Sequence, residues 1–99
     1  NDGAVDFLED SDTVEVTCSI TAKGAKPHRF EHVPENQQEL IRRVKYYERV
    51  GAEAIIERSR KKAVDALMLH PLVNSFTLAE ELADRYIELN RPYTGAWEV

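Results

Sequence analysis

The sequence predicts an α+β fold in which an N-terminal strand or hairpin is followed by about three helices. Residues 13–20 alternate apolar and polar side chains, which is the period of a half-buried β-strand. From residue 40 onwards, apolar residues recur at steps of three and four, which is the period of amphipathic helices. Pro34 lies between the two patterns, and we expect it to separate the β part from the helical part.

The predicted strand, residues 13–20, is rich in β-branched residues and has one apolar face. That face is made by Val14, Val16, Cys18 and Ile20. Because a free cysteine behaves as a small hydrophobe, we expect Cys18 to be buried with this face. Residues 23–27 contain a glycine and a proline and predict a turn, after which residues 28–33 are expected to return as a short second strand.

The first helix is expected to begin at Pro34, whose fixed φ suits a first helical turn, and Glu35 adds favourable negative charge there. Its broad apolar face is made by Leu40, Ile41, Val44, Tyr47, Val50, Gly51, Ala54 and Ile55. A glycine inside a helix costs about 1 kcal/mol relative to alanine. We therefore expect Gly51 to mark a close approach to another element.

Two further helices are predicted after a break or bend around residues 57–60, because residues 58–62 are all polar. The second helix is expected to end near Leu69 or His70, since Pro71 disfavours helical backbone in the residue before it.

The last helix is predicted to begin with a capping box at residues 77–80. Thr77 would be its N-cap, and Glu80 would reach back to the cap. We expect this helix to stop between Asn90 and Pro92.

The composition is that of one small domain or a piece of one, with 99 residues of which 42% are hydrophobic. No apolar run is long enough to span a membrane, and no charged-then-apolar leader indicates secretion. A single cysteine excludes an internal disulfide and fits a reducing compartment, so we expect a cytoplasmic protein. Because the first residue is asparagine, we expect a piece of a longer protein, with residues 1–12 the remnant of an upstream loop and residues 13–99 a C-terminal domain.

The net charge of -5 is unevenly distributed along the chain. Residues 1–22 carry six acidic and no basic side chains, residues 23–62 carry eleven basic and six acidic ones, and residues 63–99 carry two basic and six acidic ones. A basic segment is one feature of proteins that bind polyanions. Since no aromatic stacking platform accompanies these bases, the pattern favours a solvated helix face over nucleic-acid binding.

Cysteine and histidine are the residue types most often used as metal ligands or nucleophiles. Cys18 lies in phase with an apolar strand face, which favours a structural role. His28 and His32 are four residues apart, but Pro27 argues against a helix there, and on a strand this spacing is too long to close easily on one ion. His70 precedes a proline at a helix end, where its charged form would complement the helix dipole, so we expect a capping role.

Pairs of carboxylates, which ordinary glycosidases use as acid and base, occur at Glu9-Asp10 and Glu80-Glu81. Neither pair has an apolar pocket implied around it, and we expect both to be solvated. The sequence contains no glycine-rich nucleotide loop, P-loop or Ser-His-Asp arrangement. The residues alone therefore predict an α+β piece without an identifiable catalytic site.

Several short motifs nevertheless occur together between Val14 and Trp97. They are Asp12-Thr13-Val14 with Val16, Gly24 and Pro27, then Tyr47-Glu48-Arg49 and Ala52-Glu53-Ala54, then Ala63 to Val73, and finally Asp84, Tyr86, Asn90-Arg91, Tyr93 and Trp97. In this combination the chain resembles the C-terminal portion of the NAD- and manganese-dependent family 4 glycoside hydrolases. The His-Pro-Leu-Val junction at residues 70–73 and the Asn-Arg-Pro-Tyr ending at residues 90–93 are most similar to the 6-phospho-β-glucosidases.

The resemblance implies that these residues are the C-terminal part of a lactate-dehydrogenase-like second domain. It implies an enzyme in which NAD, bound by an upstream Rossmann domain, oxidises the sugar 3-hydroxyl, manganese stabilises the enolate, and the aglycone leaves by elimination. The family's metal cysteine belongs to a Cys-Asn-x-Pro motif, whereas Cys18 is followed by Ser19, and none of the three histidines follows an asparagine as the family's metal histidine does. We therefore assign no catalytic, cofactor-binding or metal residue here and expect no cofactor in this piece. One alternative stays open, that residues 1–3 belong to a loop near the sugar site.

The leading hypothesis is thus the C-terminal portion of a 6-phospho-β-glucosidase, which hydrolyses phosphorylated β-glucosides in carbohydrate catabolism, with the portion itself inactive. Its expected partners are the upstream NAD-binding catalytic domain and, in a homo-oligomer, a second subunit; neither nucleic acid nor membrane is expected. The alternative is a free-standing, non-catalytic helical module for protein interaction. The missing initiator methionine and the apolar strand face, which has too little sequence opposite to cover it, favour the first hypothesis.

Overall fold

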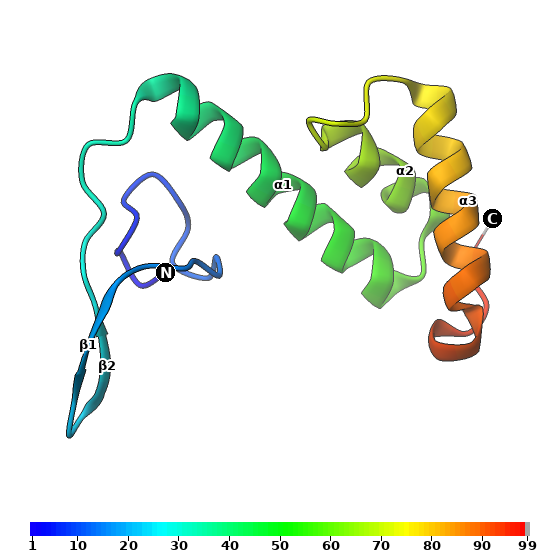
Figure 1. Ribbon diagram of the computed structural model, residues 1–99. Helices are drawn as coiled ribbons and strands as arrows, with labels where there is room; N and C mark the ends of the chain where they lie inside the picture. The colour runs from blue at the N-terminus through cyan, green and yellow to red at the C-terminus, as the bar shows by residue number, and fades with distance from the viewer. Residues whose placement is uncertain (99) are drawn as a thin grey trace. The chain divides into compact units, whose positions relative to one another are not determined.

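A computed structural model describes residues 1–98 and confirms the predicted order of a hairpin followed by three helices (Figure 1). The elements are β1 (Cys18–Thr21), β2 (Gly24–Pro27), α1 (Glu35–Glu57), α2 (Arg60–Leu69) and α3 (Phe76–Thr94). The chain divides into two compact units, Asn1–Arg42 and Arg43–Val99, and α1 runs from the first into the second.

Strands β1 and β2 pair antiparallel, with Cys18 opposite Pro27 and Thr21 opposite Gly24. The connection is tight because the Thr21 hydroxyl donates to the Gly24 carbonyl at 3.1 Å and accepts from the Lys23 amide at 3.1 Å. Gly24 has a φ of 105°, a conformation that side chains with a Cβ rarely adopt. The glycine at this position is therefore needed for the turn.

The predicted strand boundaries were wrong on both sides of the turn. The first strand begins at Cys18 rather than at residue 13, and the second occupies Gly24–Pro27 in place of residues 28–33. Alternation of apolar side chains indicates extended backbone, but a strand also needs a partner to hydrogen-bond. Within the described residues, each strand pairs with only four residues of the other. One further hydrogen bond follows, from the His28 amide to the Thr17 carbonyl at 2.8 Å.

Burial of the apolar strand face was also predicted wrongly. Cys18 is exposed, and Ile20 keeps 80% of its surface exposed. Val14 and Val16 are only partly covered. A two-stranded ribbon has no second layer of its own, so nothing in the described chain covers this side of it.

Helix α1 ends at a two-residue break, as the polar run predicted. Arg58 takes a φ of 54°, and the Ser59 amide donates back to the Ala54 carbonyl at 3.0 Å. Ser59 then serves as N-cap of α2, its hydroxyl accepting from the Lys62 amide at 3.3 Å. The C-terminal tail runs beside this break, where the Glu98 amide donates to the Arg58 carbonyl at 2.9 Å.

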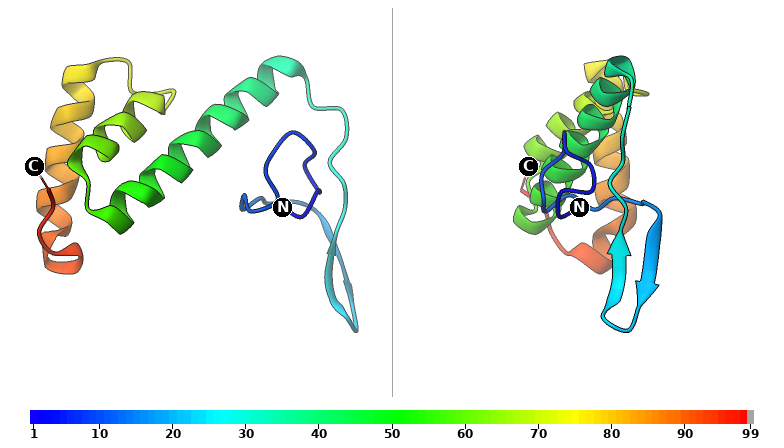
Figure 2. Two further views of the ribbon diagram at one scale, coloured as in Figure 1. Left: turned by 180° about the vertical axis from the view of Figure 1, so that it is seen from behind. Right: turned by 90° about the vertical axis from the view of Figure 1, so that its left-hand side faces the viewer.

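Helices α2 and α3 pack side by side, as the three ribbon views agree (Figure 2). Their shared core contains Val64, Val73, Ala79 and Ala83, with Ala63, Leu67 and Leu82 packed around it. Every fully covered residue of this unit is small, and no large side chain among the described residues is more than 98% buried. The two helices approach closely because alanine keeps their backbones near each other.

Charged groups fasten the three helices of the second unit together. The Arg60 guanidinium on α2 donates to both carboxylate oxygens of Asp84 on α3, at 2.6 and 3.0 Å. The Lys62 ammonium on α2 donates to Glu57 and Glu53 of α1 at 2.8 and 3.0 Å.

A third contact joins the N-terminal half of α1 to the C-terminal end of α2. The Arg43 guanidinium donates to the Leu69 carbonyl at 2.8 Å, at the end of α2 where a positive charge is favourable.

The ends of α3 differ from the prediction. Ser75, not Thr77, is the N-cap, and its hydroxyl accepts from the Leu78 amide at 3.0 Å. The helix also runs past Pro92 to Thr94, because a proline near the end of a helix removes only one backbone hydrogen bond. No described helix combines the length and the apolar character needed to cross a membrane.

Replacing Ser75 with alanine removes the side-chain acceptor at the start of α3. Loss of an N-cap costs about 1 kcal/mol, so we expect Ser75→Ala to lower the free energy of unfolding by about that amount in urea denaturation followed by circular dichroism. The matched control, Thr77→Ala, lies inside the helix and should have a much smaller effect. Equal losses in the two variants would contradict the observed cap.

The contact between Arg60 and Asp84 makes stability depend on pH in one direction. The hydrogen bonds from Arg60 hold the pKa of Asp84 below its ordinary value of 3.8. The contribution of this carboxylate is therefore present above pH 3.8 and is lost as the pH falls through the lower folded-state pKa. We expect Asp84→Asn to lower the Tm at neutral pH, and the difference from the parent chain to disappear well below pH 3.8.

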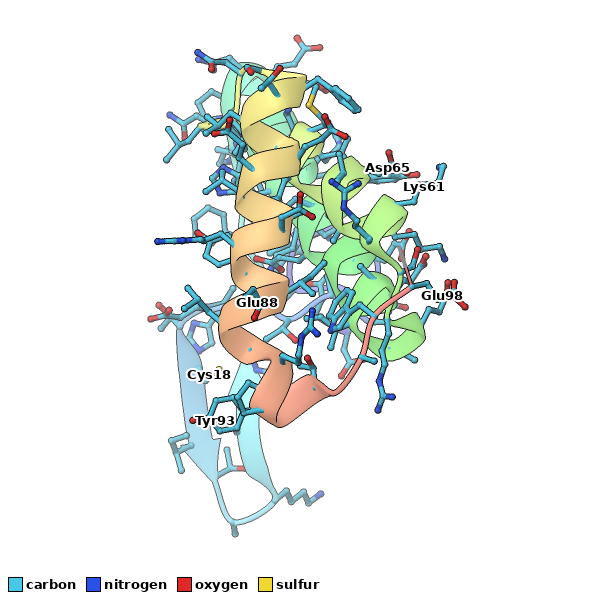
Figure 3. The ribbon with its side chains drawn as sticks, turned by 90° about the vertical axis from the view of Figure 1, so that its right-hand side faces the viewer. Cys18, Lys61, Asp65, Glu88, Tyr93 and Glu98 are labelled. Carbon is cyan, nitrogen blue, oxygen red and sulfur yellow. The ribbon has the colours of Figure 1, made fainter. Side chains whose placement is uncertain are left out.

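The matched control for this variant is Asp65→Asn. Asp65 pairs with Lys61 at 3.0 Å on the outer face of α2, the helix that also carries Arg60. The lysine side chain of this pair is 86% exposed (Figure 3). Exposed pairs of this kind contribute little, so the control should leave the Tm nearly unchanged at either pH. A Tm difference for Asp84→Asn that persists in acid would show that lost packing, and not charge, is responsible.

Candidate functional site

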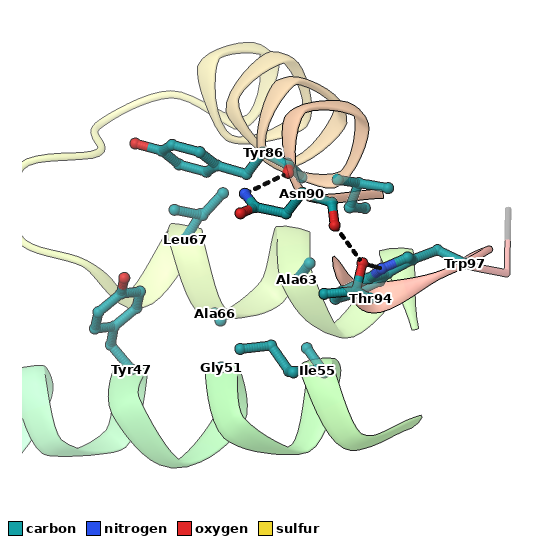
Figure 4. Close-up of a pocket in the computed structure, with 13 residues that line it drawn as sticks. Tyr47, Gly51, Ile55, Ala63, Ala66, Leu67, Tyr86, Asn90, Thr94 and Trp97 are labelled. Atoms are coloured by element: carbon teal, nitrogen blue, oxygen red, sulfur yellow. Dashed lines mark hydrogen bonds between the residues drawn. The ribbon is translucent and has the colours of Figure 1, made fainter. Parts of the chain in front are cut away.

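The second unit contains an apolar groove that opens between α1 and α3, with α2 at its base (Figure 4). It has a volume of about 340 Å³. The floor consists of the small residues Gly51, Ala54, Ala63, Ala66 and Ala83, and the walls of Tyr47, Ile55, Leu67, Tyr86 and Ile87. Asn90, Thr94 and Trp97 lie at one end. We refer to this feature as the α1–α3 groove.

Three polar side chains at one end of the α1–α3 groove, those of Asn90, Thr94 and Trp97, have partners within the chain. The Asn90 amide donates to the Tyr86 carbonyl at 2.8 Å, and the Thr94 hydroxyl donates to the Asn90 carbonyl at 3.2 Å. The indole of Trp97 donates to the Thr94 hydroxyl at 2.9 Å. None of the described residues that line the groove is charged. Its surface therefore suits apolar side chains better than a phosphorylated sugar.

Gly51 lies on the floor of this groove, near the middle of α1. Apart from its two chain neighbours and the nearby backbone of α1, a Cβ added to it would meet no described atom within 4 Å. The close approach predicted from this glycine is therefore not made by any other described part of the chain, because an alanine would fit without a shift.

Large apolar side chains remain exposed around the groove. Ile55 is 58% exposed and Tyr86 is 54% exposed, although both belong to its walls. Further along α3, Tyr93 is 87% exposed (Figure 3). A compact unit of this size normally covers such side chains, so this exposed surface indicates an interaction site.

The first unit contains a loop, residues 1–12, that is organised around the side chain of Asn1. The Asn1 amide donates to the carbonyls of Val5, Leu8 and Glu9 at 2.8, 3.3 and 3.1 Å, and its oxygen accepts from the Val5 amide at 2.7 Å. Asp12 is buried and closes the loop by accepting from the Glu9 amide at 3.0 Å. The loop has a defined internal structure, and its polar groups are used within it.

A second hollow, of about 420 Å³, lies in the first unit between this loop and residues 29–38. Its basic group, Arg29, donates to Asp6 at 3.2 Å, so the two charges offset each other. Arg42 lies over the ring of Phe7, 5.2 Å from its centre, as in a cation–π contact. The arginine that lines this hollow, Arg29, is thus already paired with a carboxylate, which makes the hollow a poor site for an anionic ligand.

The residues considered as metal ligands are not brought together. His28 lies 2.6 Å from the Ser19 hydroxyl across the hairpin, whereas His32 is exposed and has a φ of 57°. Cys18 is exposed and makes one long contact, 3.5 Å, to the Val16 carbonyl. Among residues 1–98 no cluster of three or more His, Cys, Asp or Glu is placed to hold a metal ion.

His70 caps the end of α2, as predicted, but by a different interaction. Its backbone amide donates to the Leu67 carbonyl at 3.1 Å, and its ring Nδ1 accepts from the Leu72 amide at 3.1 Å. The ring thus acts as a hydrogen-bond acceptor for the backbone just after α2. The ring also meets the edge of Tyr47, with centroids 4.7 Å apart.

The carboxylate pairs do not form an acid–base site. Glu80 lies 3.8 Å from Arg60 and Glu81 is exposed, so this pair belongs to the surface of α3. Glu9 and Asp10 are exposed in the N-terminal loop. The geometry of the described residues therefore offers an apolar groove as its best-defined site.

Comparison with known proteins identifies the relatives of this chain. Residues 1–73 match the family 4 glycosyl hydrolase C-terminal domain. A "Probable 6-phospho-beta-glucosidase" from Bacillus subtilis is 34% identical over 94% of this chain and 21% of its own length. The 6-phospho-beta-glucosidase BglT of Thermotoga maritima is 33% identical over 94% of this chain and 22% of its length. The chain thus spans about a fifth of the length of these relatives.

Solved structures agree with the sequence comparison. The crystal structure of a 6-phospho-alpha-glucosidase from gut microorganisms, in complex with NAD and glucose-6-phosphate, matches 99% of this chain and 22% of its own. It has a TM-score of 0.87 and 33% sequence identity. A second 6-phospho-alpha-glucosidase structure, with NAD and Mn²⁺, has a TM-score of 0.83 and 29% identity over 98% of this chain and 22% of its own.

The bonds of Asn1 predict a specific effect of replacing it. Asn1→Asp keeps the oxygen that accepts from Val5 but removes the three donated bonds, and it places a negative charge against the carbonyls. We expect faster hydrogen exchange at the amides of Val5 and Glu9, measured by mass spectrometry or NMR. Exchange in α2 and α3 serves as the internal control and should not change. Unchanged exchange within residues 1–12 would contradict the role of Asn1.

Proposed function

Because the chain belongs to the family 4 glycosyl hydrolases, whose C-terminal domain it matches, we propose that it is the C-terminal portion of a 6-phospho-β-glucosidase. The whole enzyme would hydrolyse phosphorylated β-glucosides in carbohydrate catabolism. This portion supplies helices that complete the protein, and it contributes no catalytic residue.

The β-specificity is proposed from the similarity of this chain to 6-phospho-β-glucosidases. The two β-specific relatives are 34% and 33% identical to this chain. The phospho-α-glucosidases of Clostridium acetobutylicum and Leptotrichia buccalis are 30% and 29% identical over the same length. The solved 6-phospho-alpha-glucosidase, at 33%, is equally similar, so an assay with both anomers is the test that distinguishes them.

NAD and manganese are proposed to be bound by the rest of the enzyme. The residues described here do not fit a manganese site, because His28 bonds to Ser19 and Cys18 makes only a contact to a backbone carbonyl. No step of the reaction is therefore assigned to this chain. Its proposed partner is the NAD-binding catalytic domain of the same polypeptide, within a homo-oligomer.

The division of the chain follows from this role. Residues 1–12 are proposed to be a loop that leads from the catalytic domain, and residues 13–99 the body of the C-terminal domain, within a family match that itself begins at residue 1. The loop built on Asn1 supports this proposal, since it is closed by its own hydrogen bonds. A single cysteine, exposed and unpaired, supports a location in the reducing cytoplasm.

The test is an assay of the full polypeptide encoded by the gene that carries this sequence. Supplied with NAD and Mn²⁺, it should hydrolyse 4-nitrophenyl β-glucoside 6-phosphate faster than the α anomer. The 99-residue chain alone, as the matched control, should hydrolyse neither. Preference for the α anomer would overturn the β-specificity, and a start codon directly before Asn1 would favour the alternative, a non-catalytic interaction module.

A further inference from the structure

We infer that the α1–α3 groove is the docking site for an apolar helix from the NAD-binding part of the same polypeptide. This inference rests on the proposed function in one respect, that the chain belongs to a longer polypeptide. It concerns how this chain packs against the NAD-binding part, and it is independent of which glucoside the enzyme hydrolyses.

The first argument is the glycine on the groove floor. Gly51 lies inside a 23-residue helix, where a glycine costs about 1 kcal/mol relative to alanine. Apart from its two chain neighbours and the nearby backbone of α1, no described atom lies within 4 Å of the position that its Cβ would occupy. Packing inside this chain therefore gives no reason for a glycine, whereas close approach of a backbone from outside gives one.

The second argument is the chemistry of the groove. Its floor is made of glycine and alanine, which lets another helix come near the backbones of α1 and α2. Its polar groups at Asn90 and Trp97 are bonded within the chain, and no charged side chain lines it. An occupant with aliphatic side chains would cover Ile55 and Tyr86 without leaving any of these polar groups unpaired.

The third argument is the length of polypeptide available in the relatives. The solved 6-phospho-alpha-glucosidase contains the same arrangement of elements, with a TM-score of 0.87 over 99% of this chain. That arrangement accounts for only 22% of its length, so most of that protein lies outside the matched part. Protein interiors are close-packed. An apolar groove of this kind inside a larger enzyme would therefore be filled by another part of that enzyme.

The test compares one substitution in two contexts. In the 99-residue chain, Gly51→Leu should leave the Tm unchanged or raise it, because leucine favours the helix and its Cβ meets nothing. In the full polypeptide the same leucine would occupy the space of the docked helix. We expect it to lower the Tm clearly and to reduce the yield of soluble, NAD-binding protein.

The matched control is Ala52→Leu, which adds a side chain of the same size to the exposed neighbouring position of α1, outside the groove. It should be tolerated in both contexts. Gly51→Leu tolerated equally well in the full polypeptide would overturn the inference, even if the enzyme proves β-specific. Conversely, the enzyme could prefer the α anomer while Gly51→Leu lowers the Tm of the full polypeptide only. That result would overturn the proposed substrate and still support the docking site.

A second copy of the chain is the competing occupant, and sedimentation equilibrium distinguishes it. We expect the 99-residue chain to be monomeric at micromolar concentrations, or to self-associate equally with and without Gly51→Leu. Dimerisation of the parent chain that is abolished by Gly51→Leu and retained by Ala52→Leu would assign the groove to a second copy and overturn the inference.

Discussion

The break between α1 and α2 positions the helices of the second unit, and the other contacts depend on it. Arg58 takes up a left-handed conformation, Ser59 bonds back to α1 and caps α2, and the chain thereby reverses within two residues. Only after this reversal can Lys62 bond to Glu57 across the two helices. The same reversal leaves α1 and α3 on opposite sides of α2, which creates the walls of the groove.

A core of small side chains is the second constraint on this unit. Ala79 and Ala83 are fully covered, whereas Ile55, Tyr86 and Tyr93 remain largely exposed. Small residues bury little apolar area, so the α2–α3 core contributes less than a core of leucines and aromatic rings would. Arg60 and its carboxylate partner Asp84 hold α2 against α3 by hydrogen bonds. The exposed apolar side chains consequently leave this unit with an uncovered apolar surface.

The helical part of the fold was predictable because its signals are local. The polar run at residues 58–62 indicated the break, and Pro71 indicated the end of α2 near Leu69. The cap of α3 was less predictable, since Ser75 and Thr77 are both good capping residues and only the path of the connecting loop selects between them. Local patterns of this kind identify an element more reliably than they identify its first residue.

By itself, the sequence determined the order of elements, the family of the chain through its motifs, and the presence of an apolar glycine-containing face on α1. Only the tertiary structure decided that Cys18 is exposed and that no other described element packs against Gly51. Alternation along a strand says which side chains share a face, but burial requires a second layer, and the described chain provides none for the hairpin. Likewise, the helical period places Gly51 on the inner face, but only the distances around it show that the space opposite is open within the described chain.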